Sequence, residues 1–256
     1  MARRRTLSSW RGTFGIVSPT FTAGSLEELI RFLPKGIGVL QVQNDLREHT
    51  AAEFKRVIAG YEERIAKLAE EGCDLISPSG APPFMVQGFK KETSLVRGWE
   101  RKFKTPMFTA SQNLVHALKA LRARNLIAAT YDFGSGTDKM FRKYLTEAGF
   151  KILDMVLVPL DTNFAATVSM EAAYPIIRRA CFKHKAAESI LLIGGGWRDM
   201  RVIELLEQDT GLPVVHHVAS RAWEVMKRFR VNEPKADHGR LLRDLPEPTR
   251  AFPPIT

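Results

Sequence analysis

The stretch LLIGGGWRDM, residues 191–200, changes from apolar to polar across three consecutive glycines. Apolar residues run into Gly194, Gly195 and Gly196, and a polar segment follows. This is the pattern of a buried strand that ends in a bare turn before a helix. A chain that omits three side chains at a strand end either needs unusual backbone dihedral angles there or lets another group approach the backbone closely.

Short apolar runs alternate with amphipathic stretches on both sides of this turn. Strands are expected at 14–19, 36–43, 74–80, 106–110, 126–132, 152–159, 189–195 and 213–218. Helices are expected from Ser25, where Glu28 completes a capping box, and at 49–71, 91–103, 111–123, 136–148, 168–183, 198–209 and 218–229. Alternating strands and helices predict the α/β class, with mostly parallel sheets covered by helices.

An approximate internal repeat predicts two similar lobes. Segment 73–82, CDLISPSGAP, is similar to segment 188–197, ESILLIGGGW, and Gly80 matches Gly194. We expect a first lobe at 12–112 that includes part of the C-terminal segment, a second lobe at 113–229, and an extended, proline- and charge-rich tail at 230–256. The lobes would be related by a pseudo-twofold axis and would face each other across a cleft.

The bulk composition restricts the possible partners and compartment. The net charge is +10, but residues 1–11 contribute +4 and residues 226–256 contribute +3, so the body of the chain is nearly balanced. This distribution argues against nucleic acid as the main partner. No apolar run is long enough to span a membrane, and the N-terminus has no secretory pattern. Two distant cysteines imply no disulfide framework, so a cytoplasmic location is expected.

Ligands of open parallel sheets bind beyond the carboxyl ends of the strands, and these ends provide the candidate site. The candidate binding residues there are Ser18, Asn44, Gly80, Ala81, Tyr131, Gly194, Gly195 and Gly196, and the candidate catalytic residues are Asp132, His216 and His217. Backbone N–H groups in glycine turns near helix N-termini favour an anion, although tight packing alone would also explain the glycines. No metal-ligand spacing or dinucleotide fingerprint is present, so neither a metal nor a cofactor is expected.

The element order, the repeat, and the segments GCDLISPSGAPPFMVQG (72–88) and ESILLIGGGW (188–197) resemble the aspartate/glutamate racemase superfamily. Within it, residues 12–229 are most similar to the branch of arylmalonate decarboxylases and maleate cis-trans isomerases. The resemblance implies cofactor-independent chemistry on a small carboxylate in the interlobe cleft, performed by one or two cysteines at two strand ends. It places Gly80 and Gly194 at those positions, Tyr131 near a carboxylate-binding tyrosine, and a homodimer as the candidate assembly.

The two cysteines of this chain do not restore that chemistry. Cys73 precedes its strand and Cys181 falls inside a helical stretch. His216 and His217 close the last strand, and a histidine in a cleft can act as a general acid or base. The leading hypothesis is a decarboxylase/lyase or isomerase in which His217 or His216, with Asp132, replaces the thiols. The alternatives are a non-catalytic carboxylate-binding or regulatory protein, and histidines that serve only as hydrogen-bonding groups at a strand end.

Overall fold

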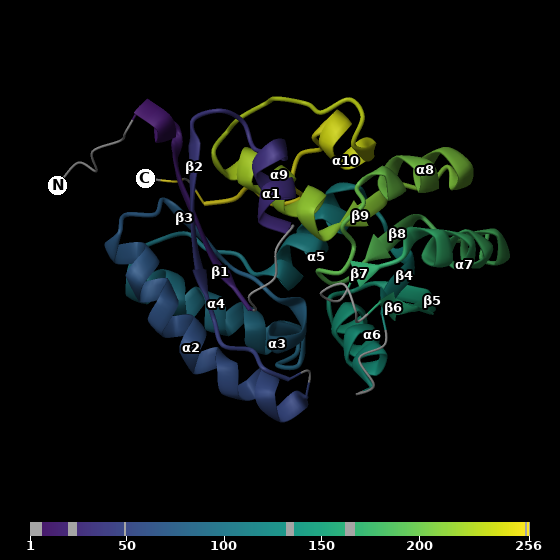
Figure 1. Ribbon diagram of the computed structural model, residues 1–256, viewed down its shortest axis with the longest axis horizontal. Helices are drawn as coiled ribbons and strands as arrows, with labels where there is room; N and C mark the ends of the chain where they lie inside the picture. Colours follow the sequence, from purple (N-terminus) through teal and green to yellow (C-terminus); the bar gives the residue numbers. More distant parts are fainter. Residues whose placement is uncertain are drawn as a thin grey trace.

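A computed structural model describes residues 7–19, 25–48, 50–131, 136–161, 167–253 and 255. Two separate parallel sheets, each flanked by helices, form two lobes (Figure 1). The strand order is β2-β1-β3 in the first sheet and β5-β4-β8-β9 in the second. A separate two-stranded antiparallel pair, β6-β7, lies beside them. The predicted α/β class with two lobes is therefore confirmed.

The first lobe is built around β1, whose apolar side chains are buried on both faces. Its strands are β1 (Gly12–Ser18), β2 (Ile37–Gln43) and β3 (Leu75–Pro78), and its helices are α2 (Ala51–Glu70), α3 (Ala81–Met85) and α4 (Phe89–Phe103). A short 3-10 helix (Leu7–Ser9) precedes β1, and α1 (Ser25–Phe32) begins at Ser25 as predicted. The strand expected at 106–110 is reduced to one parallel bridge between Met107 and Ile76.

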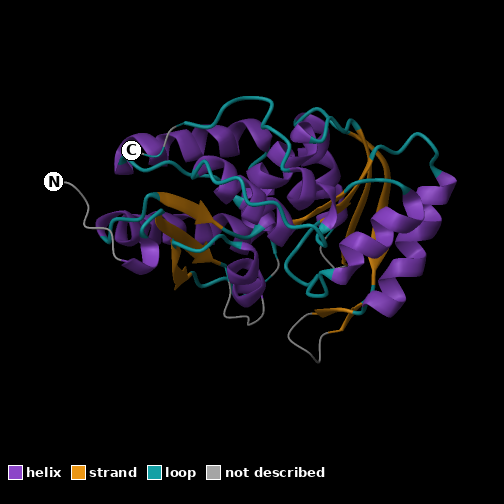
Figure 2. Cartoon of the chain, turned by 90° about the horizontal axis from the view of Figure 1, so that it is seen from above, coloured by secondary structure: helices purple, strands orange, loops and turns teal. Residues whose placement is uncertain are grey.

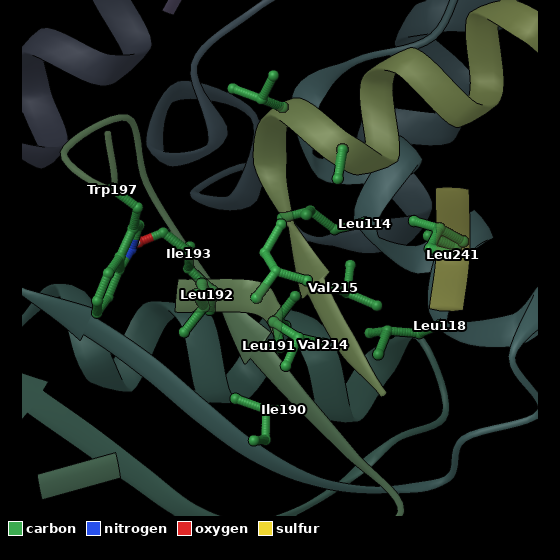
Figure 3. Packing of buried hydrophobic residues seen from close by; sticks show 14 of the residues in the cluster. Leu114, Leu118, Ile190, Leu191, Leu192, Ile193, Trp197, Val214, Val215 and Leu241 are labelled. Atoms are coloured by element: carbon green, nitrogen blue, oxygen red, sulfur yellow. The ribbon is translucent and has the colours of Figure 1, made fainter. Parts of the chain in front are cut away.

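The second lobe is built around β4, which pairs with β5 and β8 in parallel. Its main elements are β4 (Asn125–Tyr131), α6 (Thr137–Glu147), β5 (Lys151–Val158), α7 (Met170–Lys183), β8 (Ser189–Leu192), α8 (Arg201–Thr210) and β9 (Val214–His216). The antiparallel pair β6 (Leu160–Asp161) and β7 (Thr167–Val168) was not anticipated by the apolar pattern. Ile190, Leu191 and Leu192 pack with Val214 and Val215, as Figure 3 shows. This fully buried core explains the continuous apolar run of residues 190–193.

Helices α5 (Ala110–Ala120) and α9 (His217–Arg228) pack against each other between the two sheets (Figures 1 and 2). Thr109 and Gln112 form a capping box that starts α5. Eleven of the twelve residues of α9 are buried, which marks it as a helix enclosed on all sides. The lobe boundary expected at 112/113 falls inside α5.

The C-terminal segment corrects one prediction. Residues 230–256 are expected to be extended, but Gly239–Asp244 form helix α10, and Leu241, Leu242 and Leu245 are buried in the core. The Glu207 carboxylate accepts hydrogen bonds from the Arg240 and Val214 backbone N–H groups, which anchors this helix. The proline and charge content obscured three leucines that were available for burial. Within the described residues, no helix is long and apolar enough to cross a membrane.

Candidate active site at the start of helix α9

The glycine turn after β8 fits closely around Tyr131. Gly194 has a φ of +109°, and a Cβ placed on it would lie 2.4 Å from the Tyr131 hydroxyl oxygen. That hydroxyl accepts a hydrogen bond from the Gly196 N–H at 3.0 Å, and burial raises the pKa of Tyr131 to about 12. Close packing therefore explains Gly194, and the Tyr131 hydroxyl takes one of the donors expected to bind an anion. Gly195 differs, because it is exposed and a Cβ on it would meet nothing.

The glycine turn after β3 also needs a glycine. Gly80 has a φ of +96°, and a Cβ on it would lie 3.0 Å from the Tyr61 hydroxyl oxygen and from the Pro19 ring. Tyr61 donates a hydrogen bond to the Ser79 carbonyl, which fixes the turn against α2. The Ala81 carbonyl accepts a hydrogen bond from the Ser111 hydroxyl at 3.4 Å, which ties the same turn to α5.

Two further candidate binding residues lie at the ends of β1 and β2. Ser18 is the last residue of β1, and its carbonyl accepts the Asn44 N–H at 2.7 Å. The Asn44 side chain is buried and donates to the Val57 carbonyl at 3.1 Å, so it holds the end of β2 against α2. A hydrogen bond between Asn44 and Tyr61 also lowers the pKa of Tyr61, against the larger rise that burial causes. Asn44 thus supports the Gly80 turn through Tyr61.

His216 ends β9 and caps α9. Its Nδ1 accepts the Val218 N–H at 3.2 Å, so Nε2 carries the proton that it donates to the Trp197 carbonyl at 3.0 Å. Both ring nitrogens are therefore used by backbone groups, and the tautomer is fixed. Burial lowers the pKa of His216 to about 4, which keeps the ring neutral. This geometry is that of a hydrogen-bonded histidine at a strand end.

His217 has a different environment, although its ring centroid lies only 4.4 Å from that of His216. It is the first residue of α9, it is 8% exposed, and neither of its ring nitrogens has a hydrogen-bond partner in the described part of the chain. Burial, followed by the charges of His216 and Arg221, keeps its pKa well below the ordinary value. His217 is thus the histidine whose nitrogens remain available to a ligand.

Arg221 is a site residue that the sequence analysis missed. It lies one helical turn beyond His217 and is 7% exposed. Its Nε has no hydrogen-bond partner among the residues that the structure describes, and burial lowers the pKa of Arg221 to about 10. The available signal was an arginine four residues after His217 in one helical stretch, because residues four apart share a helix face.

The start of α9 links the two glycine turns. His216 bonds to the Trp197 carbonyl, directly after the Gly194–Gly196 turn, and Figure 3 shows Trp197 beside Ile193, whose carbonyl accepts from the indole. On the other side, the Ser220 hydroxyl donates to Asn113 of α5 at 3.1 Å, and α5 contacts the Gly80 turn through Ser111. The structure therefore brings both turns and both histidines to one place. Asp132 lies outside the described residues.

Neither cysteine belongs to this site. Cys73 is buried, and its sulfur would lie 2.9 Å from a Cβ placed on Gly15 of β1. Cys181 is buried in α7, and burial raises the pKa of its thiol to about 11, so it is not an activated thiolate. Among the described residues, no group of three histidine, cysteine or acidic side chains could hold a metal ion.

Solved structures with the same fold include enzymes of two kinds. A maleate isomerase from Pseudomonas putida S16 has a TM-score of 0.79 and 14% identity, over 91% of this chain and 99% of that one. Unliganded arylmalonate decarboxylase has a TM-score of 0.78 and 18% identity, over 91% and 99%. A Nocardia farcinica maleate cis-trans isomerase bound to TRIS has a TM-score of 0.76 and 16% identity, over 91% and 98%. At these identities the likeness shows the fold.

The sequence itself provides the family. No curated protein matches the chain closely enough to serve as a relative. The family model described as arylmalonate decarboxylase matches residues 18–242, which include both glycine turns, all of α9 and most of α10. Because this match spans most of the sequence, the chain belongs to the arylmalonate decarboxylase family.

Proposed function

We propose that this protein is a cofactor-independent enzyme of the decarboxylase/lyase or isomerase type, which acts on a small carboxylate between its two lobes. The observation that carries the proposal is His217, a buried imidazole with no hydrogen-bond partner on either ring nitrogen in the described residues. Buried polar groups in folded proteins are nearly always satisfied, so an unsatisfied imidazole at a strand end marks a place where a ligand or water completes the bonding.

The charge state of His217 suits proton transfer at the carbon next to a carboxylate. Its pKa is well below the ordinary value, so the free enzyme holds a neutral imidazole that can accept a proton. A bound anion favours the imidazolium form, because an opposite charge nearby raises the pKa of a base. In an isomerase-type reaction that inverts a stereocentre, the α-proton moves to the ring and the electron pair moves into the carboxylate. Water then protonates the opposite face of that carbon, and the ring returns its proton to solvent. In a decarboxylase-type reaction, CO₂ leaves, the imidazolium protonates the remaining carbanion, and solvent restores the proton.

His216 and Asp132 stay in the proposal with different roles. The His216 ring is held by the Trp197 carbonyl and the Val218 N–H, so it would position α9 and the ring of His217 beside it. Asp132 directly follows β4 in the sequence and remains the candidate carboxylate partner. The Ala81 N–H group would complete the anion site together with the Gly195 N–H group, which the substrate would have to share with the Tyr131 hydroxyl, and the side chains of Ser18 and Asn44 would lie at its edge.

One observation favours the alternative, a non-catalytic carboxylate-binding or regulatory protein. The Tyr131 hydroxyl already accepts the Gly196 N–H and also interacts with the Gly195 N–H, so the donors of the second-lobe turn are engaged within the chain. An enzyme would need Tyr131 to share these donors with the substrate. A binding protein could keep the Tyr131 hydroxyl where it is.

The test is turnover of a panel of small carboxylates, which contains α-substituted malonates and maleate, followed by ¹H NMR. The unaltered protein should convert at least one member, and His217→Gln should lose at least about a hundredfold in rate, which is the scale of one general acid–base group. His184→Gln, which replaces a partly exposed histidine at the end of α7, is the matched control and should retain the rate. Conversion that is equally fast in His217→Gln would refute the proposed role of His217.

A further inference from the structure

We propose that Arg221 is the charged anchor for the substrate carboxylate, in place of the neutral hydroxyl and backbone donors of the glycine turns. That the bound anion is a carboxylate rests on the proposed function. That Arg221 binds an anion follows from its own surroundings. Arg221 would bind and orient the substrate, one helical turn from the His217 imidazole that moves the proton.

The first argument is the absence of a counter-charge. Arg221 is 7% exposed, and in the described part of the chain its Nε has no hydrogen-bond partner and no carboxylate lies within ion-pair distance of its guanidinium. The charge of Arg221 interacts with the hydroxyl of Tyr61. Tyr61 is neutral at physiological pH, because burial raises its pKa, so it supplies no counter-charge. A buried charge with no partner is costly to keep, so a binding anion would relieve an existing penalty.

Arg228 on the same helix shows what a structural arginine looks like in this protein. It is 6% exposed, like Arg221, but its Nε and one terminal nitrogen donate to Glu224 at 2.9 and 2.7 Å. Its guanidinium also lies over the rings of Phe108 and Phe252. Among the described residues, no acid pairs with the Arg221 guanidinium and no aromatic ring lies under it. The contacts that hold Arg228 in α9 therefore do not account for the burial of Arg221.

The second argument is that other buried polar atoms without partners in the described residues lie on segments connected to α9 or to Tyr61. Within the described ranges the Asn113 Nδ2 has no partner, although the Asn113 oxygen accepts a hydrogen bond from the hydroxyl of Ser220, the residue before Arg221. The Ser79 hydroxyl has none either, and its carbonyl is held by Tyr61, whose pKa the charge of Arg221 lowers. With both ring nitrogens of His217, these donors and acceptors come from three elements that converge on the Gly80 turn. Because buried polar groups are nearly always satisfied, these groups indicate that a ligand or water completes their hydrogen bonding.

The guanidinium determines the kind of anion and its placement. Its planar fork matches the two oxygens of a carboxylate, and the pair is stronger than a hydrogen bond to a neutral donor. His217 and Arg221 are four residues apart on one helix, so their Cβ atoms lie roughly 5–6 Å from each other. A carboxylate held by Arg221 therefore puts its α-carbon on the side of His217. The substrate class that fits is a small carboxylic acid that reacts at the carbon next to the anchored carboxylate.

The experiment measures thermal stabilisation by maleate, phenylacetate and inorganic phosphate in the unaltered protein and in Arg221→Met, Arg221→Lys and Arg228→Met. At least one carboxylate should stabilise the unaltered protein and Arg228→Met. Arg221→Met should bind that carboxylate at least about tenfold more weakly, the scale of a lost charged hydrogen bond, and Arg221→Lys should recover part of the loss. Without ligand, Arg221→Met should melt at or above the temperature of the unaltered protein, whereas Arg228→Met should melt lower because the buried Glu224 loses its arginine partner and keeps only His116.

Three results would overturn the inference: an undiminished carboxylate shift in Arg221→Met, a larger shift from phosphate than from either carboxylate, or no carboxylate shift in the unaltered protein. A ligand-free melting loss in Arg221→Met as large as that in Arg228→Met would also overturn it, because it would assign Arg221 a structural role. Arg221-dependent binding in a protein that converts no carboxylate would sustain the inference while the proposed enzymatic function failed.

Discussion

Replacement of Gly194 by alanine tests the packing of the glycine turn against Tyr131. The new Cβ would lie 2.4 Å from the Tyr131 hydroxyl oxygen and 2.7 Å from the ring carbon that bears it, distances that real contacts do not tolerate. Because Tyr131 must move, the hydrogen bond from the Gly196 N–H is lost as well. The φ of +109° is unfavourable for alanine in addition.

The expected magnitude follows from these two effects. The unfavourable backbone conformation costs about 1–2 kcal/mol, and loss of a buried hydrogen bond costs about 1 kcal/mol. Gly194→Ala should therefore lower the free energy of unfolding by roughly 2–3 kcal/mol, or the melting temperature by roughly 4–12 °C for a chain of this size. Gly195→Ala is the matched control, because a Cβ on Gly195 meets nothing within 4 Å and its φ is not in the left-handed region.

Urea unfolding and thermal melts of the two variants provide the measurement. Gly195→Ala should stay within about 0.5 kcal/mol of the unaltered protein, which is typical of an open surface position. Equal stability losses in the two variants would show that Tyr131 does not occupy the space beside Gly194, and would contradict the predicted collision.

Three further predictions concern the buried polar network and the C-terminal segment. Glu92 is fully buried, accepts hydrogen bonds from Thr109 and Tyr144, and has its pKa raised to about 7, so the folded state binds its proton more tightly than the unfolded state. Stability therefore falls as pH rises from about 4.5 to 7, and Glu92→Gln should gain about 3 kcal/mol relative to the unaltered protein over that interval in urea titrations. His216 has the opposite sign, because its pKa is lowered to about 4: its contribution is present above about pH 6.5 and is lost as pH falls toward 4, by on the order of 3 kcal/mol. A His216→Asn variant, which keeps a capping side chain, should lack this acid-side decline, and an unchanged pH profile would contradict the assignment. Truncation after residue 235 should lower stability by at least about 4 kcal/mol, because it exposes the leucine contacts of α10 and removes the Pro246 carbonyl that accepts from Trp223; an unchanged melt would contradict the packed tail.

The sequence predicts the two-lobed fold well because each prediction rests on a local pattern. Apolar runs such as 189–195 and amphipathic stretches such as 49–71 correspond to β8 and α2, with ends shifted by a few residues. The prediction of an extended tail was wrong because it followed the proline and charge content of residues 230–256 and gave no weight to Leu241, Leu242 and Leu245. Helix α3 was missed because a five-residue helix that contains two prolines has no amphipathic period.

The candidate site was only partly predictable. Strand ends gave the two glycine turns and the histidine pair, because their position follows from the parallel topology. Which histidine has free nitrogens depends on Trp197 and Val218, whose backbone atoms reach His216 only in the fold. Tyr61 and Arg221 lie in the interiors of helices. A sequence pattern predicts that such residues are buried, but it does not predict whether a buried side chain has a hydrogen-bond or ion-pair partner.

The most direct test of the account is the rate at which solvent deuterium enters the α-carbon of a carboxylate that the protein converts, measured by ¹H NMR in D₂O for the unaltered protein and for His217→Gln. Deuterium should enter the α-carbon in the unaltered protein, and its incorporation should slow by at least about a hundredfold in His217→Gln. The Arg221-dependent binding of the same carboxylate should be retained in the variant. Equal incorporation in both proteins would contradict the account, since the proton would then reach carbon without His217.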